Sequence, residues 1–152
     1  MTIHYGYYAA TDDAHAADAV EHDTLEEMGA GYDQLVLTGL DPELHTPVLD
    51  SLISGRPAQA VEADPPYGAF VNSSDDGRTV CHAFTGAFRD ALAGLAPEAV
   101  PAVAAAWAAS DAVQGDADAA ELLAQVLTEL TGIARDAADR GDGLYYWISV
   151  PA

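Results

Sequence analysis

The pattern of apolar and polar residues predicts strands at both ends of the chain and a long helix before the last strand. Thr2–Ala9 and Leu144–Val150 are rich in aromatic and β-branched residues, which favour strands. Between Asp116 and Arg140, apolar residues recur every three or four positions, so one face of a helix is expected to be buried there. Asp116 precedes this run and is expected to cap the helix.

Gly, Pro and Asp-Gly turn signals divide the middle of the chain. Tyr67–Asn72 and Arg78–Phe84 flank a Ser-Ser-Asp-Asp-Gly run, whose Asp-Gly tip is typical of a β-hairpin. A further strand is predicted over Gln34–Thr38 and a loop over Arg56–Pro66. The predicted helices cover Asp12–Met28, Pro42 or Pro47 to Ser54, Thr85 or Gly86 to Leu95, and Pro97–Ser110. The order β-α-β-α-β-β-α-α-α-β predicts one α+β domain over residues 1–152, with a single-layer mixed or antiparallel sheet of about five strands packed against about five helices.

The charge balance narrows the classes of partner. The chain has 25 acidic residues, five Arg and no Lys, and its formal net charge is −20. Such a chain lacks the clustered cations that bind phosphates, so we expect no nucleic-acid partner and no anionic membrane partner. The acidity fits solubility through self-repulsion, a basic protein partner or adaptation to high salt.

The chain also lacks features of a secreted or membrane protein. Its longest apolar run, Ala99–Ser110, contains Pro101 and is too short to span a bilayer. A single cysteine, Cys81, cannot form an internal disulfide, which favours a reducing compartment. We therefore expect a soluble cytoplasmic protein, and the sequence makes no prediction of its oligomeric state.

The two terminal strands carry the residues best suited to binding. Because strand side chains alternate between faces, His4 and Tyr8 share one face of the first strand, and Tyr145 and Trp147 share one face of the last. His82 joins them if its strand is adjacent. Aromatic rings and histidines on an open sheet face suit a protein interface or a shallow ligand site. In the simpler interpretation, helices or a loop cover this face and the rings belong to the core.

Two clusters resemble metal sites only loosely. His15, Asp18 and His22 share one side of the predicted first helix, but their spacing matches no established zinc site. A solvated polar face is the better interpretation. The acids between Asp116 and Glu121 lack the calcium-loop pattern and suit the start of a helix, where negative charge is favourable. No metal site and no cofactor are predicted.

No nucleophilic centre is evident either. Cys81 precedes His82, but neighbours on a strand point to opposite faces, so they cannot act as nucleophile and base. A buried structural thiol is expected. The chain contains no Gly-x-Ser-x-Gly motif, phosphate loop or dinucleotide fingerprint, and no catalytic residue is predicted.

Both ends of the chain carry a resemblance to a known family. Gly6-Tyr7-Tyr8 followed by an acid-capped helix resembles the opening of the YfbM-like family of uncharacterised bacterial proteins. The long helix, the Arg140-Gly141 break and the closing strand resemble that family's ending, and Leu-Tyr-Tyr-Trp after such a helix resembles small actinobacterial hypothetical proteins. The residues from Gly55 to Asp118 depart from the family pattern. The resemblance implies an α+β fold and assigns no catalytic residues.

The sequence thus favours a small acidic protein that binds another protein, such as an immunity protein, an inhibitor or a regulatory accessory protein. The alternative is a small enzyme or small-molecule binder. It requires a pocket on the sheet lined by His4, Tyr8, His82, Tyr145 and Trp147, where Tyr and His would supply acid–base chemistry.

Overall fold

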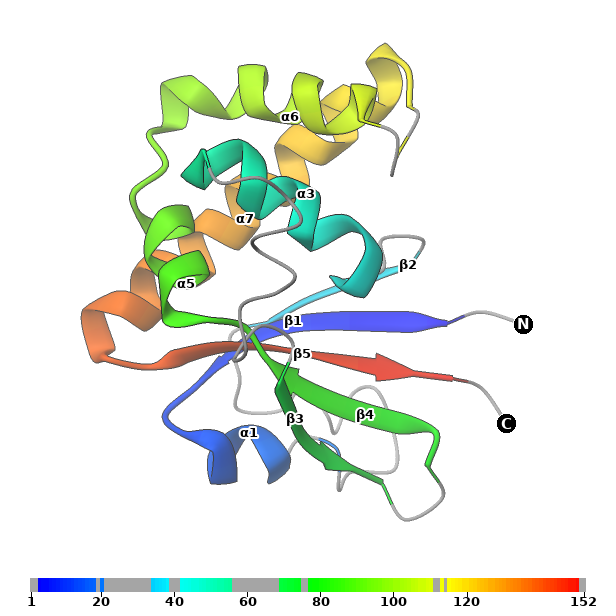
Figure 1. The fold of residues 1–152 in the computed structure, drawn as a ribbon, viewed down its shortest axis with the longest axis vertical. Helices are drawn as coiled ribbons and strands as arrows, with labels where there is room; N and C mark the ends of the chain where they lie inside the picture. Colours follow the sequence, from blue (N-terminus) through cyan, green and yellow to red (C-terminus); the bar gives the residue numbers. More distant parts are fainter. Residues whose placement is uncertain are drawn as a thin grey trace.

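The computed structural model describes residues 3–18, 20, 34–38, 42–55, 69–74, 77–110, 113 and 115–150. Within them, the α+β class and the predicted order of elements are confirmed (Figure 1). The strands are β1 (His4–Ala10), β2 (Gln34–Thr38), β3 (Ala69–Ser73), β4 (Thr79–Ala83) and β5 (Gly143–Ser149). The helices are α1 (Asp13–Asp18), α3 (Pro42–Ser54), α5 (Gly86–Ala93), α6 (Val100–Ala109) and α7 (Ala117–Arg140), with a 3-10 turn over Pro97–Ala99.

The strands form one antiparallel sheet in the order β2-β1-β5-β4-β3. The first and last strands are therefore central neighbours, and His4 is paired with Ser149 at one end of this pair. Strands β2 and β3 form the edges of the described sheet. The sequence predicted a mixed or an antiparallel sheet, and the sheet is antiparallel.

The predicted hairpin is present as β3 and β4. Its register shifts between Phe70 and Asn72, so β3 contains a bulge. At the turn between β3 and β4, the Ser74 N–H donates to the Thr79 carbonyl at 2.8 Å. Gly77 has a positive φ of 72°. That conformation favours glycine, because a side chain would meet the backbone.

Local capping sets the ends of α5 and α7. The Thr85 hydroxyl accepts a bond from the Phe88 N–H at 3.0 Å at the start of α5. The predicted cap of α7 is confirmed, since an Asp116 carboxylate oxygen accepts from the Ala119 N–H at 3.1 Å. Gly141 ends α7 in the left-handed conformation, with φ 75°.

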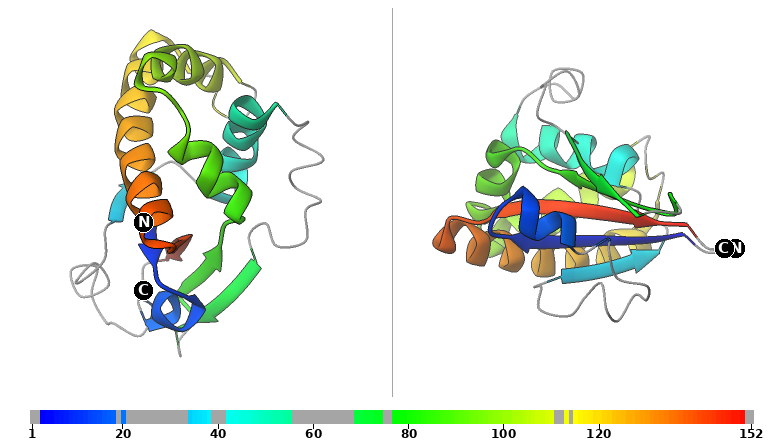
Figure 2. Two further views of the ribbon diagram at one scale, coloured as in Figure 1. Left: turned by 90° about the vertical axis from the view of Figure 1, so that its left-hand side faces the viewer. Right: turned by 90° about the horizontal axis from the view of Figure 1, so that it is seen from below.

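The sheet has a helix layer on each side, and the two layers are unequal. Helices α3, α5, α6 and α7 lie on one side, whereas α1 lies on the other (Figures 1 and 2). The larger core lies between the first group and the sheet, and includes Phe88, Leu92, Trp107, Leu127 and Leu130. A second, smaller core lies under α1. Four of the five described α-helices therefore lie on one side of the sheet.

Some predictions fall outside the described residues. They are the predicted first helix beyond Val20 and the loop over Arg56–Pro66. Among the described helices, none is by itself long and apolar enough to cross a membrane, and one pair, Gly86–Ala93 with Pro97–Ala109, meets that criterion only across a 92° bend.

Candidate functional site

Strand register divides the aromatic residues between two faces of the sheet. Tyr8 lies opposite Tyr145, and Gly6 lies opposite Trp147, so these side chains share the side covered by α1, here called the α1 face. Tyr7 lies opposite Tyr146 on the other side, here called the α7 face. The predicted grouping of His4, Tyr8, Tyr145 and Trp147 on one face is therefore confirmed.

His82 does not belong to that group. It lies directly opposite Tyr146, and its ring stacks on the Tyr146 ring with centroids 5.2 Å apart and planes 6° apart. Strand β4 is adjacent to β5, as the prediction required, but the register places His82 on the α7 face. A shift of one residue in this pairing would have put it on the other side.

The rings of the α1 face are buried. Tyr8 and Trp147 have no exposed surface and Tyr145 is 5% exposed, because Ala16 of α1 and Val20 pack over them. His4 remains half-buried at the far end of β1. The expected ring-bearing surface facing solvent is therefore absent from these residues, and the simpler interpretation of a covered core describes them.

Cys81 lies within this second core as a protonated thiol. The Tyr8 hydroxyl donates to the Ala16 carbonyl at 2.7 Å, and it also shares a hydrogen bond with the Cys81 sulfur at 2.8 Å. Burial is the main cause that raises the pKa of the Cys81 thiol to about 11. The hydrogen bond with Tyr8 lowers this pKa, and the negative charge of Asp13 raises it further. A thiol with this pKa is a weak nucleophile near neutral pH. The expected structural role fits this geometry.

Two further bonds hold α1 on the sheet. The Tyr145 hydroxyl donates to an Asp13 carboxylate oxygen at 2.9 Å, and the Asn72 side-chain amide donates to the Ala17 carbonyl at 3.2 Å. Burial and the bond to Asp13 raise the pKa of Tyr145 well above its usual value. Tyr145 is therefore a fixed hydrogen-bond donor and a poor acid–base group near neutral pH.

On the α7 face, a row of rings runs across the strands from the edge to the centre. Phe70 of β3 meets His82 edge-on with centroids 5.8 Å apart, His82 stacks on Tyr146, and Tyr146 lies opposite Tyr7. Phe70 is 64% exposed, His82 is half-buried, and Tyr146 is 2% exposed. The row thus emerges from the core toward β3.

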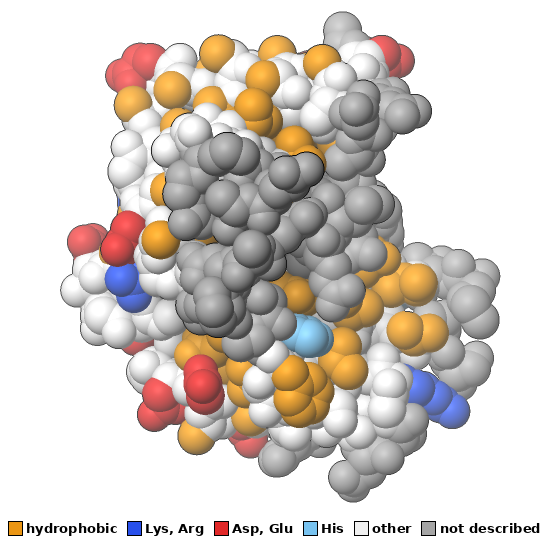
Figure 3. Space-filling model, in the orientation of Figure 1, with side chains coloured by type: hydrophobic (Ala, Val, Ile, Leu, Met, Phe, Trp, Pro, Cys, Tyr) orange, Lys and Arg blue, Asp and Glu red, His pale blue; other side chains and the backbone are white. Residues whose placement is uncertain are grey.

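The open end of this row follows from how the helices cover the sheet. Helix α7 packs on β1, β2 and β5, and α5 packs on β5. Among the described helices, α1 makes the main contacts with β3 and β4, and it does so from the opposite face. Hydrophobic side chains and a histidine are accordingly visible over the hairpin region in Figure 3. Phe70 was missed as a site residue, because its exposure depends on which helices reach the hairpin.

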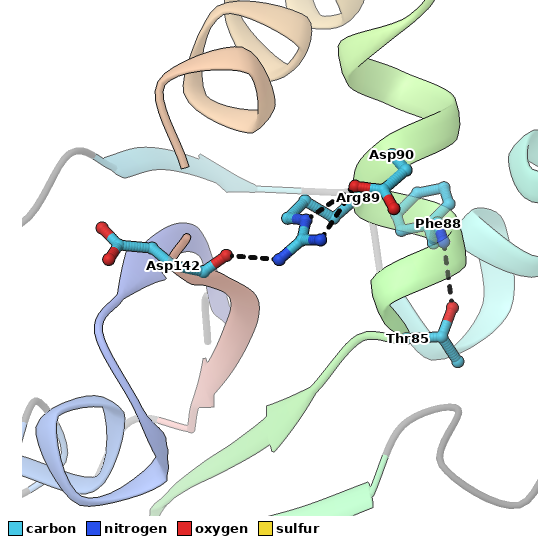
Figure 4. A network of polar contacts seen from close by, with 5 residues as sticks. All are labelled: Thr85, Phe88, Arg89, Asp90 and Asp142. Carbon is cyan, nitrogen blue, oxygen red and sulfur yellow. Dashed lines mark hydrogen bonds and ion pairs between the residues drawn. The ribbon is translucent and has the colours of Figure 1, made fainter. Parts of the chain in front are cut away.

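Arginines near the start of β5 are used structurally. Arg89 donates to the Asp142 carbonyl at 2.7 Å and pairs with Asp90 at 2.9 Å (Figure 4). Arg140 pairs with the Asp142 carboxylate at 2.7 Å. Arg135 donates to the backbone carbonyls of Ala93, the last residue of α5, and of Leu95 just beyond it. These cations tie α5, α7 and β5 together. The 25 acidic residues of the chain far outnumber its five arginines, so most acids have no arginine partner.

The candidate metal ligands have local structural partners. Within the described segments, no group of three or more His, Cys, Asp and Glu side chains is arranged to hold a metal ion. His15 Nδ1 accepts from the Thr11 N–H at 3.0 Å, and Asp12 accepts from the His15 N–H at 2.8 Å, as caps of α1 do. His22 lies outside the described residues.

Comparison with known proteins adds no relative: no family model, no curated protein and no solved structure matches the chain. The resemblance to the YfbM-like family therefore stays a prediction.

Proposed function

We propose that this protein acts by binding another protein, and that its partner carries a net positive charge. The observation that carries the proposal is the uncompensated charge of −20, in a chain with no Lys and five Arg. Arg89, Arg135 and Arg140 are engaged within the fold, so they do little to offset the acids elsewhere on the surface. A surface of one sign attracts an oppositely charged partner and speeds its approach.

The location proposed for this function is the cytoplasm. The buried, unpaired Cys81 supports it, because a protonated thiol in a core suits a reducing compartment. An immunity protein, an inhibitor or a regulatory accessory protein would each fit such an acidic binding module.

Affinity capture from the native host at several salt concentrations tests the proposal. We expect a stoichiometric basic partner that is retained at about 0.05 M salt and is released by about 1 M, where the screening length falls to ~3 Å. The identity of the captured protein is established by mass spectrometry, and its binding is then measured with purified components. Failure to find a stoichiometric partner at both low and moderate salt would refute the proposal.

A salt series on the isolated protein serves as the control. If the acidity is an adaptation to high salt, the melting temperature rises steeply up to molar salt. If it serves partner binding, we expect a folded protein in dilute buffer. The two explanations of the charge therefore differ in a measurement that needs no partner.

A further inference from the structure

We propose that the basic partner docks on the open part of the α7 face and places an arginine side chain against its rings. The surface consists of Phe70, Val80, His82 and Ile148, here called the ring patch. This inference rests on the proposed function, because it assigns that function a surface and a contacting side chain.

The ring patch is continuous across neighbouring strands. Phe70 lies opposite His82, and Val80 lies opposite Ile148, so the two pairs form adjacent rows on the same face. Cross-strand pairs and their diagonal neighbours lie within reach of one another. Phe70 is 64% exposed and the other three residues are half-buried, which leaves an apolar surface that extends from the core.

The fold holds these rings in place before any partner arrives. His82 is supported from below by Tyr146, which is 2% exposed, and its ring meets the Phe70 ring at nearly a right angle. The bulge after Phe70 directs Asn72 to the α1 face, where its side chain binds the Ala17 carbonyl. Bulges commonly re-aim side chains next to functional sites. The hairpin is therefore anchored from behind while Phe70 remains outside.

Leu122 has an exposure similar to that of Phe70 but a different setting. Leu122 is 61% exposed on α7, but it stands beside exposed Asp118, Glu121 and Gln125. Single apolar residues among polar ones are normal on a protein surface. Leu122 therefore provides a matched control for Phe70, with almost the same exposure and no neighbouring ring.

The ring patch itself holds no acidic side chain, so the attraction for its occupant comes from the net charge of the whole chain. A second copy of this chain would bring another −20 and would be repelled. A cationic segment is attracted by the same field. Arginine is favoured over lysine, because its planar and weakly hydrated guanidinium stacks on aromatic faces. Phe70 and His82 present such rings at the exposed end of the row.

Peptide titrations followed by NMR test this assignment without the natural partner. The probes are nona-arginine and nona-lysine, which carry equal charge, in about 0.15 M salt. We expect nona-arginine to bind more tightly and to shift the backbone amides of residues 70, 80, 82 and 148. Phe70→Ser should weaken nona-arginine about threefold and leave nona-lysine nearly unchanged, since an exposed cation–ring contact is a modest interaction. Leu122→Ser should change neither affinity.

The NMR spectrum of each variant shows whether it is folded. Phe70→Leu provides a second test, because it keeps an apolar side chain but removes the ring. It should lose the arginine preference in the same way as Phe70→Ser. Equal affinities of the two peptides for the wild type, shifts confined to the acids of α7, or equal effects of Phe70→Ser and Leu122→Ser would overturn the ring patch. The proposed function would survive that result, since capture of a basic partner does not depend on which surface it occupies.

Discussion

Replacing Gly6 with alanine tests the packing between the two central strands. A Cβ at Gly6 would lie 2.1 Å from Cε2 and 2.2 Å from Nε1 of Trp147. Ordinary contacts between heavy atoms lie near 3.5–4.0 Å, so the methyl group is more than 1 Å too close. Trp147 has no exposed surface, and the indole must push into the second core to make room.

Two opposing effects decide the outcome of Gly6→Ala. Alanine restricts the unfolded chain more than glycine does, which would stabilise the protein by about 0.4–1 kcal/mol if the methyl group fitted. Overpacking of a core costs about 1–3 kcal/mol, and more when the surroundings are rigid. Because the overlap involves a fully buried ring, we expect a net loss of about 2 kcal/mol or more in the free energy of unfolding.

Urea denaturation followed by circular dichroism measures this loss. With a typical slope of about 1–3 kcal/mol per M, a loss of about 2 kcal/mol should lower the unfolding midpoint of Gly6→Ala by about 0.7–2 M. Gly132→Ala is the matched control: Gly132 is exposed within α7 and a Cβ there meets nothing within 4 Å. Its midpoint should rise, because alanine favours a helix over glycine by about 1 kcal/mol.

A double variant separates the clash from other effects. Trp147→Leu alone should be destabilising, but Gly6→Ala should cost less in its presence, since the methyl group then enters vacated space. A Gly6→Ala protein as stable as the wild type, or strictly additive effects in the double variant, would refute the packing described here.

Two other predictions concern stability. Cys81 is protonated in the folded protein up to a pKa of about 11, whereas the free thiol ionises near pH 9.0, so the unfolded chain holds fewer protons between these values. The free energy of unfolding should therefore fall as the pH rises from 9 to 11, by about 1.4 kcal/mol per unit of pKa difference. Denaturant titrations at each pH should show a smaller fall in this free energy for Cys81→Ala than for the wild type. Asp116→Ala removes the cap of α7 and should lower the free energy of unfolding by about 1 kcal/mol, whereas an unchanged urea midpoint would show that the Asp116 bond to the Ala119 N–H contributes nothing.

Much of the fold was predictable because its signals are local. The cap at Asp116, the glycine at 141 and the apolar spacing between them lie within one segment and mark α7. The alternation along β1 and β5 assigned Tyr8, Tyr145 and Trp147 to one face, as the strand pairing confirms. The net charge depends on composition alone, so it needs no structure.

Tertiary structure decided which of these residues reach solvent. The covering of Tyr8 and Trp147 depends on α1 folding back over the sheet, and the place of His82 depends on its pairing with Tyr146, far along the chain. Local patterns specify which side chains alternate, but they do not specify which strands meet, in what register, or how far a helix extends across them. Packing of the entire chain sets those relations, and it buried the predicted rings while leaving Phe70 exposed.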